Sequence, residues 1–370
     1  MIKILNLLVK ITKTIKDTLT IQSALNKGKR ATVTINIPEG TYYIGKALKI
    51  YEGTTLILDD KAVFLRVGRD ALIKNGSSLK RYYGYEGNSH IKIRGGTFDM
   101  NGNNCPYNNT AMSIGHARNI EIDAVTFKNV VGGHAIDACG LDGVHIHHCN
   151  FLGFYDVNGN RSFSETIQLD MFVKGAFPKF GANDGTISRN VLIEHCYFGS
   201  SKEGVMHSWN RAIGSHASRL NYYYENIIIQ NNIFEETKDY ALTPLKGKHI
   251  IIKDNVFINC AGGIRYLGVY KGKNMHSLDG QQTGRQGGNH FDVLQNIFVE
   301  CKSLDVLHIR SHKIAPHHDV NIIRNVFLGE NGPIQLTAVK DVEIIQNSQL
   351  PPLNQLHVEN KRITSNTKSI

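Results

Sequence analysis

One pattern of apolar and polar positions recurs along the chain. In Ile250–Phe257 the first and third residues are apolar, the fourth is polar, the sixth is Asn255 and the eighth is Phe257. The same template returns in the following segments, the last of which lacks the aromatic residue: Ile91–Phe98, Ile120–Phe127, Val144–Phe151, Val191–Phe198, Ile227–Phe234, Phe291–Phe298, Val320–Phe327 and Val342–Gln349. Internal repetition of this kind indicates a stacked, solenoid architecture.

The length and composition of the repeat decide which solenoid is expected. The shortest step between template phenylalanines, from Phe234 to Phe257, is 23 residues. The apolar positions alternate and are rich in Ile, Val and Phe, which is typical of strands rather than helices. A strand-built unit of about two dozen residues fits one coil of a parallel β-helix. The sequence therefore predicts an all-β fold, a right-handed parallel β-helix.

The sixth template position predicts a column of stacked side chains. Neighbouring strands lie about 4.8 Å apart, so amides in such a column can bond to one another and to the turn backbone. The column contains Asn232, Asn255, Asn296, Asn325 and Asn347, joined by Cys149 and Cys196. The six cysteines show no metal-ligand spacing, and we expect buried thiols rather than disulfides.

We expect three segments along the chain. Residues 1–17 alternate Lys with Ile and Leu and form an N-terminal basic segment, whereas 18–350 form a single β-helix domain. A short helix near Asp17–Lys27 is expected to cap the open end of the first coil. Residues 351–370 begin with two prolines and are rich in Asn, Thr, Ser and Lys, so we expect a frayed C-terminal tail.

Three early segments resemble the start of pectin-lyase-like β-helix proteins: Ile37–Ile44 (I-P-E-G-T-Y-Y-I), Leu56–Phe64 (L-I-L-D-D-K-A-V-F) and Gly95–Gly102 (G-G-T-F-D-M-N-G). That superfamily includes polygalacturonases, pectate lyases and phage tailspikes. The resemblance covers roughly residues 18–350 and implies a polysaccharide ligand in a groove along one side of the β-helix. It identifies the fold, and the reaction has to be argued from the site.

Charge and composition narrow the partners. The chain carries 42 Lys and Arg against 32 Asp and Glu, a net charge of +10, which favours an anionic partner such as an acidic polysaccharide. The basic residues are dispersed and no nucleic-acid motif is present, so we expect no nucleic-acid partner. No segment has the roughly twenty apolar residues of a membrane span. We expect an extracellular, cell-surface or virion-associated protein, although Met1–Lys10 shows no clear signal-peptide cleavage site.

The strands between the template copies carry the candidate chemistry. Their central aliphatic residues are Ile136, Ile167, Ile213, Leu242, Ile264 and Leu307, and alternation turns the residues one and three places later outward. This outward set contains Asp137, Gln168, Asp170, His216, Thr243, Arg265, His308 and Arg310. Large insertions beside these strands are the expected groove walls: Gly153–Phe163, Phe172–Ser188, Gly199–Trp209, Ala217–Glu225 and Leu267–His290.

The spacing of the acids suggests a reaction. Asp137 and Asp170 would lie one coil apart and two residues out of register, which places their backbones roughly 8 Å apart. Such spacing suits inverting glycoside hydrolysis, in which Asp170 protonates the leaving oxygen and Asp137 activates water, or the reverse, with Glu165 in reserve. His216 would tune the proton affinity of Asp170, and Arg265 would hold a substrate carboxylate. This order of acids, histidine and arginine is similar to polygalacturonases. The chain lacks their Asn-Thr-Asp, Gly-His-Gly and Arg-Ile-Lys motifs, so pectin does not follow as the substrate.

Several further residues are candidates for the site. Gln168, His308 and Arg310 would contact substrate from the outward face. Asp184 fits a turn by composition, but the preceding residues 175–181 could form a sugar-facing aromatic loop. Trp209 could stack on a sugar or anchor its own insertion. His145, His147 and His148 lack carboxylates paired with them in sequence, so we expect surface histidines and no metal site.

Three functions compete. The first is a cofactor-free glycoside hydrolase that cuts an acidic polysaccharide. The second is a polysaccharide lyase or epimerase, with neutral His216 or Arg265 as the base and Ca²⁺ as a possible aid. The third is a non-catalytic glycan-binding module of the tailspike kind. The identity of the sugar, the linkage, and the choice between monomer and homotrimer stay open.

Overall fold

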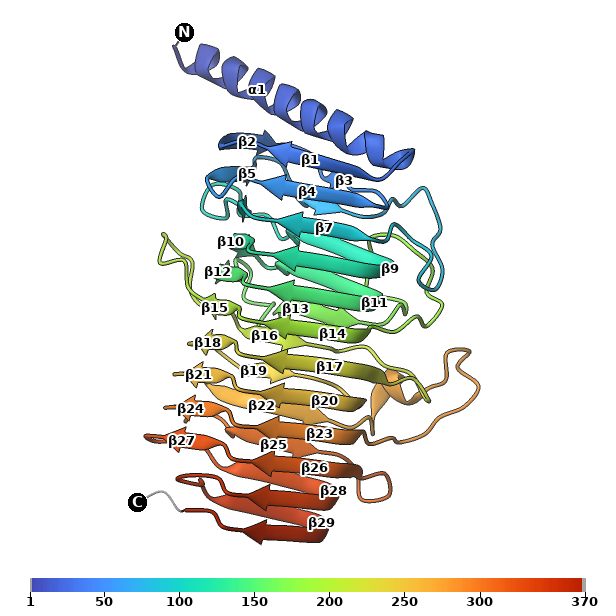
Figure 1. The fold of residues 1–370 in the computed structure, drawn as a ribbon, viewed down its shortest axis with the longest axis vertical. Helices are drawn as coiled ribbons and strands as arrows, with labels where there is room; N and C mark the ends of the chain where they lie inside the picture. The colour runs from blue at the N-terminus through green and yellow to red at the C-terminus, as the bar shows by residue number, and fades with distance from the viewer. Residues whose placement is uncertain (1, 368–370) are drawn as a thin grey trace.

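The computed structural model of the chain describes residues 2–367, with side chains from Val9 onward. Its strands stack along one long axis, with the N-terminal helix at one end (Figure 1). Every strand pairing recorded between the stacked coils is parallel, as between β11 and β13 or between β20 and β23. The expected right-handed parallel β-helix is thereby confirmed.

Two hydrogen-bonded sheets make up the stack. The larger, 19-stranded sheet contains β1 (Val33–Ile37), β3 (Leu48–Lys49), β4 (Thr54–Leu58), β6 (Ile73–Lys74), β7 (Ile91–Arg94), β9 (Met112–Asp123), β11 (Ile136–His147), β13 (Glu165–Asp170), β14 (Arg189–Glu194), β16 (Arg211–Gly214), β17 (Tyr224–Gln230), β19 (Tyr240–Thr243), β20 (Gly247–Lys253), β22 (Gly262–Leu267), β23 (Asn289–Leu294), β25 (Leu307–Arg310), β26 (His317–Ile323), β28 (Ile334–Ile345) and β29 (Leu353–Thr364). The smaller, 10-stranded sheet contains β2 (Gly40–Ile44), β5 (Ala62–Arg66), β8 (Thr97–Asp99), β10 (Thr126–Val131), β12 (Asn150–Tyr155), β15 (Tyr197–Gly199), β18 (Ile233–Glu235), β21 (Val256–Ile258), β24 (Ile297–Val299) and β27 (Val326–Leu328).

A regular coil such as β19–β21 places one strand on each of three faces. The template strands β14, β17, β20, β23 and β26 pair with one another on one face, and the strands between them, β13, β16, β19, β22 and β25, pair on a second. The long strands β9, β11, β28 and β29 run across both faces. The smaller sheet is the third face.

The template residues fill the interior column by column. The template phenylalanines are buried, and neighbouring rings from Phe64 to Phe327 lie with centroids 4.6 to 5.5 Å apart, edge-on or tilted up to Phe127 and stacked from there onward. Offset contacts of this kind add to the stabilisation that burial itself provides. Because each coil supplies the same ring at the same height, the core repeats with the sequence.

The expected asparagine column is confirmed. Asn255 Nδ2 donates to Asn296 Oδ1 at 3.0 Å and to the carbonyl of Ile229 at 2.9 Å, and the same bonds recur at each step of the ladder. The column extends to Asn366, which accepts from Asn347. Cys149 and Cys196 occupy it as buried thiols, and all six cysteines are free.

The two ends of the domain differ from expectation. Helix α1 (Ile2–Leu25) crosses the boundary predicted at residue 17, continues into η1 (Asn26–Lys29) and covers the first coil. Its Asp17 accepts from the backbone of Tyr43 at 2.9 Å, and Leu25 is fully buried. No helix among the described residues is long and apolar enough to span a membrane.

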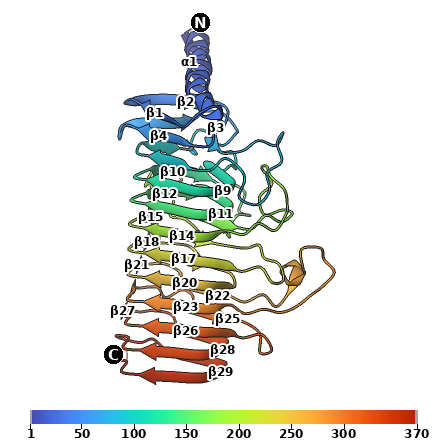
Figure 2. The same cartoon turned by 45° about the vertical axis from the view of Figure 1, so that its right-hand side comes forward.

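The frayed tail predicted after Gln349 is wrong, because β29 pairs with β28 along its whole length. Pro351 and Pro352 lie in the connection before β29, where no ladder N–H is needed, and the carbonyl of Pro352 accepts from Ile334 at 2.8 Å. The long connection that contains η2 (Gly272–Met275) projects from one side of the stack, as Figure 2 shows.

Candidate functional site

A cavity of about 360 Å³ opens over β11, β13 and the end of β16. Its lining residues are Asn108, Asn109, Thr110, Gly132, Gly133, His134, Asp137, Arg161, Phe163, Gln168, Gly175, Ala176, Pro178, Lys179 and His216. The insertions Gly153–Phe163 and Phe172–Ser188 therefore form walls at this place, as the sequence indicated. The three other insertions expected as walls contribute no lining residue to this cavity.

The register between the coils is the expected one. Asp137 pairs with Gln168, and Asp170 pairs with Cys139, so the two acids lie two residues out of register on adjacent strands. The outward positions have nevertheless become largely buried, because the insertions cover them. Asp137, Gln168 and Asp170 are at most 3% exposed.

Asp170 lies beneath the cavity and does not line it. Its side chain is fully buried, and its Oδ1 accepts from the backbone N–H groups of His216 and Ala217 and from the hydroxyl of Tyr224, each at 3.0 Å. Its Oδ2 lies 2.6 Å from His216 Nδ1. The sequence placed Asp170 against the substrate, whereas the structure surrounds it with protein donors and pairs it with His216.

His216 presents a cationic ring to the cavity. Its side chain is 47% exposed, while Nδ1 is paired with Asp170. Burial opposes protonation of the ring, but the carboxylates of Asp170, Glu165 and Asp137 outweigh that effect and raise the pKa of His216 to about 9. At neutral pH the residue is therefore an imidazolium.

Asp137 is the carboxylate that lines the cavity. Its Oδ1 accepts from Gln168 Nε2 and its Oδ2 from Lys179 Nζ, both at 3.2 Å. Burial raises the pKa of Asp137, and the ammonium of Lys179 counteracts that rise. Lys179 also donates to Thr110 Oγ1 at 3.2 Å.

The sequence left open that the loop carrying Lys179 offers aromatic rings to a sugar, and the structure contradicts this alternative. Phe177 and Phe180 are buried, and they pack with Phe172 and Tyr82. These rings anchor the insertion, and the lysine between them reaches the cavity.

Glu165 belongs to a chain of ion pairs beside the cavity. It is 1% exposed and accepts from Arg211 Nη1 at 3.2 Å, and Arg211 Nε donates to Asp239 at 2.7 Å. Burial raises the pKa of Glu165, and Arg211 counteracts the rise. Arg265 lies 3.9 Å from the same Asp239 oxygen and stacks over the ring of Tyr240. Neither Glu165 nor Arg265 lines the cavity, so the role of Arg265 in holding a substrate carboxylate stays a prediction that this cavity does not support.

Other predicted contacts lie elsewhere. Trp209 is fully buried, its Nε1 donates to the carbonyl of Phe151 at 3.2 Å, and its ring packs on Phe154. It anchors the insertion, so the alternative in which it stacks on a sugar is wrong. The carboxylate of Asp184 forms the expected turn by accepting a hydrogen bond from the backbone N–H of Thr186 at 3.0 Å. It also accepts a hydrogen bond from the backbone N–H of Gly84.

The two residues furthest along the outward face are engaged locally. His308 Nδ1 lies 2.7 Å from Asp305 Oδ2, and the guanidinium of Arg310 lies over the ring of Tyr270. Neither lines the cavity over β11 and β13.

Sequence reasoning missed four lining residues with charged or aromatic side chains. Lys179, Arg161 and Phe163 lie in insertions, whose conformation has no periodic signal. His134 precedes the outward acid in its own strand segment, and its Nδ1 lies 2.6 Å from the carbonyl oxygen of Glu165. Burial lowers the pKa of His134 to about 3, so its imidazole is neutral.

Comparisons with known proteins agree with this architecture. The sequence model of the family described as rhamnogalacturonase A/epimerase, pectate lyase-like, matches residues 2–227. The plasmin and fibronectin-binding protein A of Streptococcus pneumoniae is 27% identical over 367 residues, which cover 90% of this chain and 47% of that protein. The chain thus spans about half the length of this relative.

Solved structures show the same fold. The crystal structure of PfbA, a surface adhesin of Streptococcus pneumoniae, superposes with a TM-score of 0.73 at 22% identity, covering 93% of this chain and 87% of that one. A family 28 exopolygalacturonase of Yersinia enterocolitica superposes with a TM-score of 0.64 at 13% identity, covering 94% and 76%. With a family match over more than half its length, the chain belongs to the rhamnogalacturonase A/epimerase, pectate lyase-like family.

Proposed function

We propose that this chain is a surface protein that binds an acidic glycan in the cavity over β11 and β13. The observation that carries the proposal is the charge of the lining. Lys179, Arg161 and the imidazolium of His216 face the cavity, while its carboxylate, Asp137, is already paired. Cationic donors in a partly dry site favour a carboxylate ligand over a neutral sugar.

The lining offers a complete set of sugar contacts. A uronate carboxylate would lie between Lys179 and His216, and the amides of Asn108 and Gln168 would bond to hydroxyl groups. Phe163, which is 47% exposed, offers a ring for the apolar face of a sugar. Two relatives agree with a glycan-binding surface protein, since one is called a surface adhesin and the other an exopolygalacturonase.

Two-carboxylate hydrolysis fits this site less well. An inverting glycosidase needs one carboxyl group at the leaving oxygen and a second at the attacking water. Asp137 alone among the acids lines the cavity, whereas Asp170 and Glu165 are buried and engaged by protein donors. We therefore place binding ahead of hydrolysis.

One observation supports β-elimination as a second candidate. The Asp170–His216 pair is a carboxylate–imidazole couple whose ring lines the cavity, an arrangement suited to general-base chemistry. Above its pKa of about 9, neutral His216 would accept the proton from C5 of a uronate. The electron pair of that C–H bond would form the C4–C5 double bond, and the oxygen on C4 would leave and take a proton from water. Lys179 would neutralise the carboxylate.

The test combines binding with product analysis. Titration calorimetry with uronate oligosaccharides and their neutral counterparts should show binding of the acidic series, weakened at least about tenfold by Lys179→Gln, since a charge-assisted hydrogen bond contributes about 1.5–3 kcal/mol. Lys61→Gln, which removes a lysine that is 75% exposed on another coil, is the matched control and should bind like the wild type. Equal affinity for neutral and acidic sugars would contradict the proposal.

Products separate the reactions. An intact polymer after long incubation supports binding alone, and ultraviolet-absorbing unsaturated ends formed above pH 9 support elimination. New reducing ends without unsaturation would mean hydrolysis and would overturn the ranking given above.

A further inference from the structure

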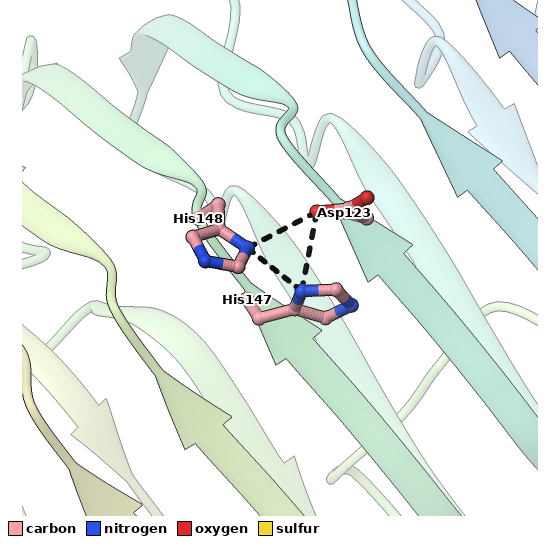
Figure 3. A group of neighbouring side chains, drawn as sticks. All are labelled: Asp123, His147 and His148. Carbon is pink, nitrogen blue, oxygen red and sulfur yellow. Dashed lines mark hydrogen bonds and ion pairs between the residues drawn. The ribbon is translucent and has the colours of Figure 1, made fainter.

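A separate cluster of side chains lies on the face made by the template strands. Asp123 ends β9, His147 ends β11 in the next coil, and His148 follows it, as Figure 3 shows. Asp123 Oδ1, His147 Nδ1 and His148 Nδ1 all lie within 4.8 Å of one another. None of the three lines the cavity described above.

The fold explains why two consecutive histidines converge. Asp123 and His147 are direct partners in the parallel register of β9 and β11, so their side chains share a face. Consecutive residues of a strand point to opposite faces, but His148 leaves the strand with a φ of 52°. This left-handed turn conformation returns the second imidazole to the side of the first.

The three ligand atoms have the separations of a preformed coordination site. The two Nδ1 atoms lie 2.9 Å apart, and they lie 3.1 Å and 3.3 Å from Asp123 Oδ1. Zinc bonds of about 2.0–2.2 Å in tetrahedral geometry place ligand atoms about 3.3 Å apart. An ion at that bond length would sit just above the plane of the three atoms, and the side chain of His148, which is 60% exposed, leaves the cluster open to solvent.

Charged and aromatic side chains surround the three ligands. A metal-bound histidine usually directs its other ring nitrogen to a carboxylate, which fixes the ring. His147 Nε2 is buried, finds no hydrogen-bond partner among the described residues, and lies 3.7 Å from Glu121 Oε1. Arg94 holds Oδ2 of Asp123 at 3.3 Å and leaves Oδ1 facing the histidines. The ring of His145 stacks on His147 with centroids 3.9 Å apart.

We propose that Asp123, His147 and His148 bind a divalent transition-metal ion of the Zn²⁺ type, with the remaining coordination position open to water. Two imidazoles with one carboxylate favour Zn²⁺, Ni²⁺, Cu²⁺ or Co²⁺ over Ca²⁺ and Mg²⁺, which require oxygen ligands. The ion would join two successive coils. The sequence predicted surface histidines without a carboxylate, because Asp123 belongs to the preceding coil and lies far from the histidines along the chain.

Equilibrium dialysis of the chelator-treated protein against Zn²⁺ tests the site. We expect one tightly bound ion per chain. His148→Ala removes a largely exposed ring and should weaken binding by more than about 100-fold, whereas Glu121→Gln, which removes a nearby charge and no hydrogen bond to His147, should cost less than about tenfold. The chain has 17 histidines, so a matched control is needed. His290→Ala removes a histidine on the same sheet that pairs with Asp319 and packs beside the ring of His249, away from the Asp123 cluster, and it should leave Zn²⁺ binding at that cluster unchanged.

Two further readouts sharpen the result. Cobalt in place of zinc should give visible absorption that His148→Ala abolishes and His290→Ala preserves, and Ca²⁺ should not displace the cobalt. Absence of stoichiometric zinc binding by the wild type, or unchanged affinity in His148→Ala, would overturn the assignment. Circular dichroism of each variant, expected to match the wild type, separates loss of a ligand from loss of the fold.

Discussion

The substitution Asp170→Asn isolates the charge that holds His216 protonated. Asparagine retains an oxygen in nearly the same place, so the backbone N–H groups of His216 and Ala217 and the hydroxyl of Tyr224 keep an acceptor. The substitution removes the negative charge 2.6 Å from His216 Nδ1. The pKa of His216, about 9 in the folded wild type, should fall toward its ordinary value of 6.5, because the nearest opposing charge is lost while burial and the charges of Glu165 and Asp137 remain.

The size of the effect on stability follows from linkage. A rise of about 2.5 pKa units corresponds to about 3.4 kcal/mol if nothing screens it. Because the ring of His216 is 47% exposed, solvent screening reduces the contribution to about 1–2 kcal/mol. The folded-state pKa lies above the unfolded one, so this stabilisation is complete below about pH 6.5 and is lost as the pH rises through about 9.

Urea unfolding at pH 6 and at pH 10 measures the effect. The free energy of unfolding of the wild type minus that of Asp170→Asn should be about 1–2 kcal/mol larger at pH 6 than at pH 10. Lys246, whose pKa burial lowers to about 7, also changes stability with pH, but it does so equally in both proteins and cancels in the difference. His216→Gln is the matched variant, because it removes the same pair from the other side and should lose the same pH dependence.

Nuclear magnetic resonance titration of His216 reports the pKa directly. The wild type and Asp170→Asn should differ in their free energies of unfolding. If this difference stays constant from pH 6 to pH 10, the proposed charge on His216 is refuted. The same result would remove the imidazolium from the glycan site, so the binding proposal depends on this measurement as well.

Three further predictions follow from the packing. Trp209→Ala should lower the unfolding free energy by about 3–5 kcal/mol in chemical denaturation, while acidic-glycan affinity per folded molecule stays unchanged, since the indole is buried away from the cavity. Asn296→Ala should cost about 2–4 kcal/mol in the same assay, because it leaves the buried N–H of Asn255 without its acceptor; a cost below about 0.5 kcal/mol would contradict the ladder's role. Truncation before β29 exposes the edge of β28 and should produce self-association in light scattering, whereas a monodisperse truncated protein would show that this edge needs no cover.

The sequence predicted the fold because every coil repeats the same physical task. The template phenylalanine is buried wherever it occurs, and the asparagine at the sixth template position donates a hydrogen bond to the asparagine of the next coil. The alternation that defines the strands also gave the correct register of Asp137 with Gln168. Positions whose environment repeats with the coil can be read from periodicity alone.

The side chains that line the cavity come largely from insertions, which have no periodic pattern, and this part of the site could not be predicted from the sequence. The rings of Phe177 and Phe180 pack inward and deliver Lys179 to Asp137, a contact between residues 42 positions apart. Burial of Trp209 arises in the same way, from an insertion folding back on Phe154. The last strand, β29, was missed because the chain after Gln349 keeps the pairing of a coil without its template aromatic residue.

If the protein proves to be an enzyme, the number of hydrogen bonds that each carboxylate already accepts from the protein decides which role it can take. Asp170 accepts from three donors and contacts the ring of His216, so its oxygens have no room for a sugar, and Asp170→Asn should shift the pH profile of kcat through His216. Asp137 lines the cavity, and its bonds to Gln168 and Lys179 are both 3.2 Å long, so a ligand can compete for them. In an active enzyme, Asp137→Asn should therefore lower kcat at every pH, with the circular dichroism spectrum unchanged. The opposite pattern, a pH-independent loss in Asp170→Asn and a shifted profile in Asp137→Asn, would show that the cavity closes differently around its substrate.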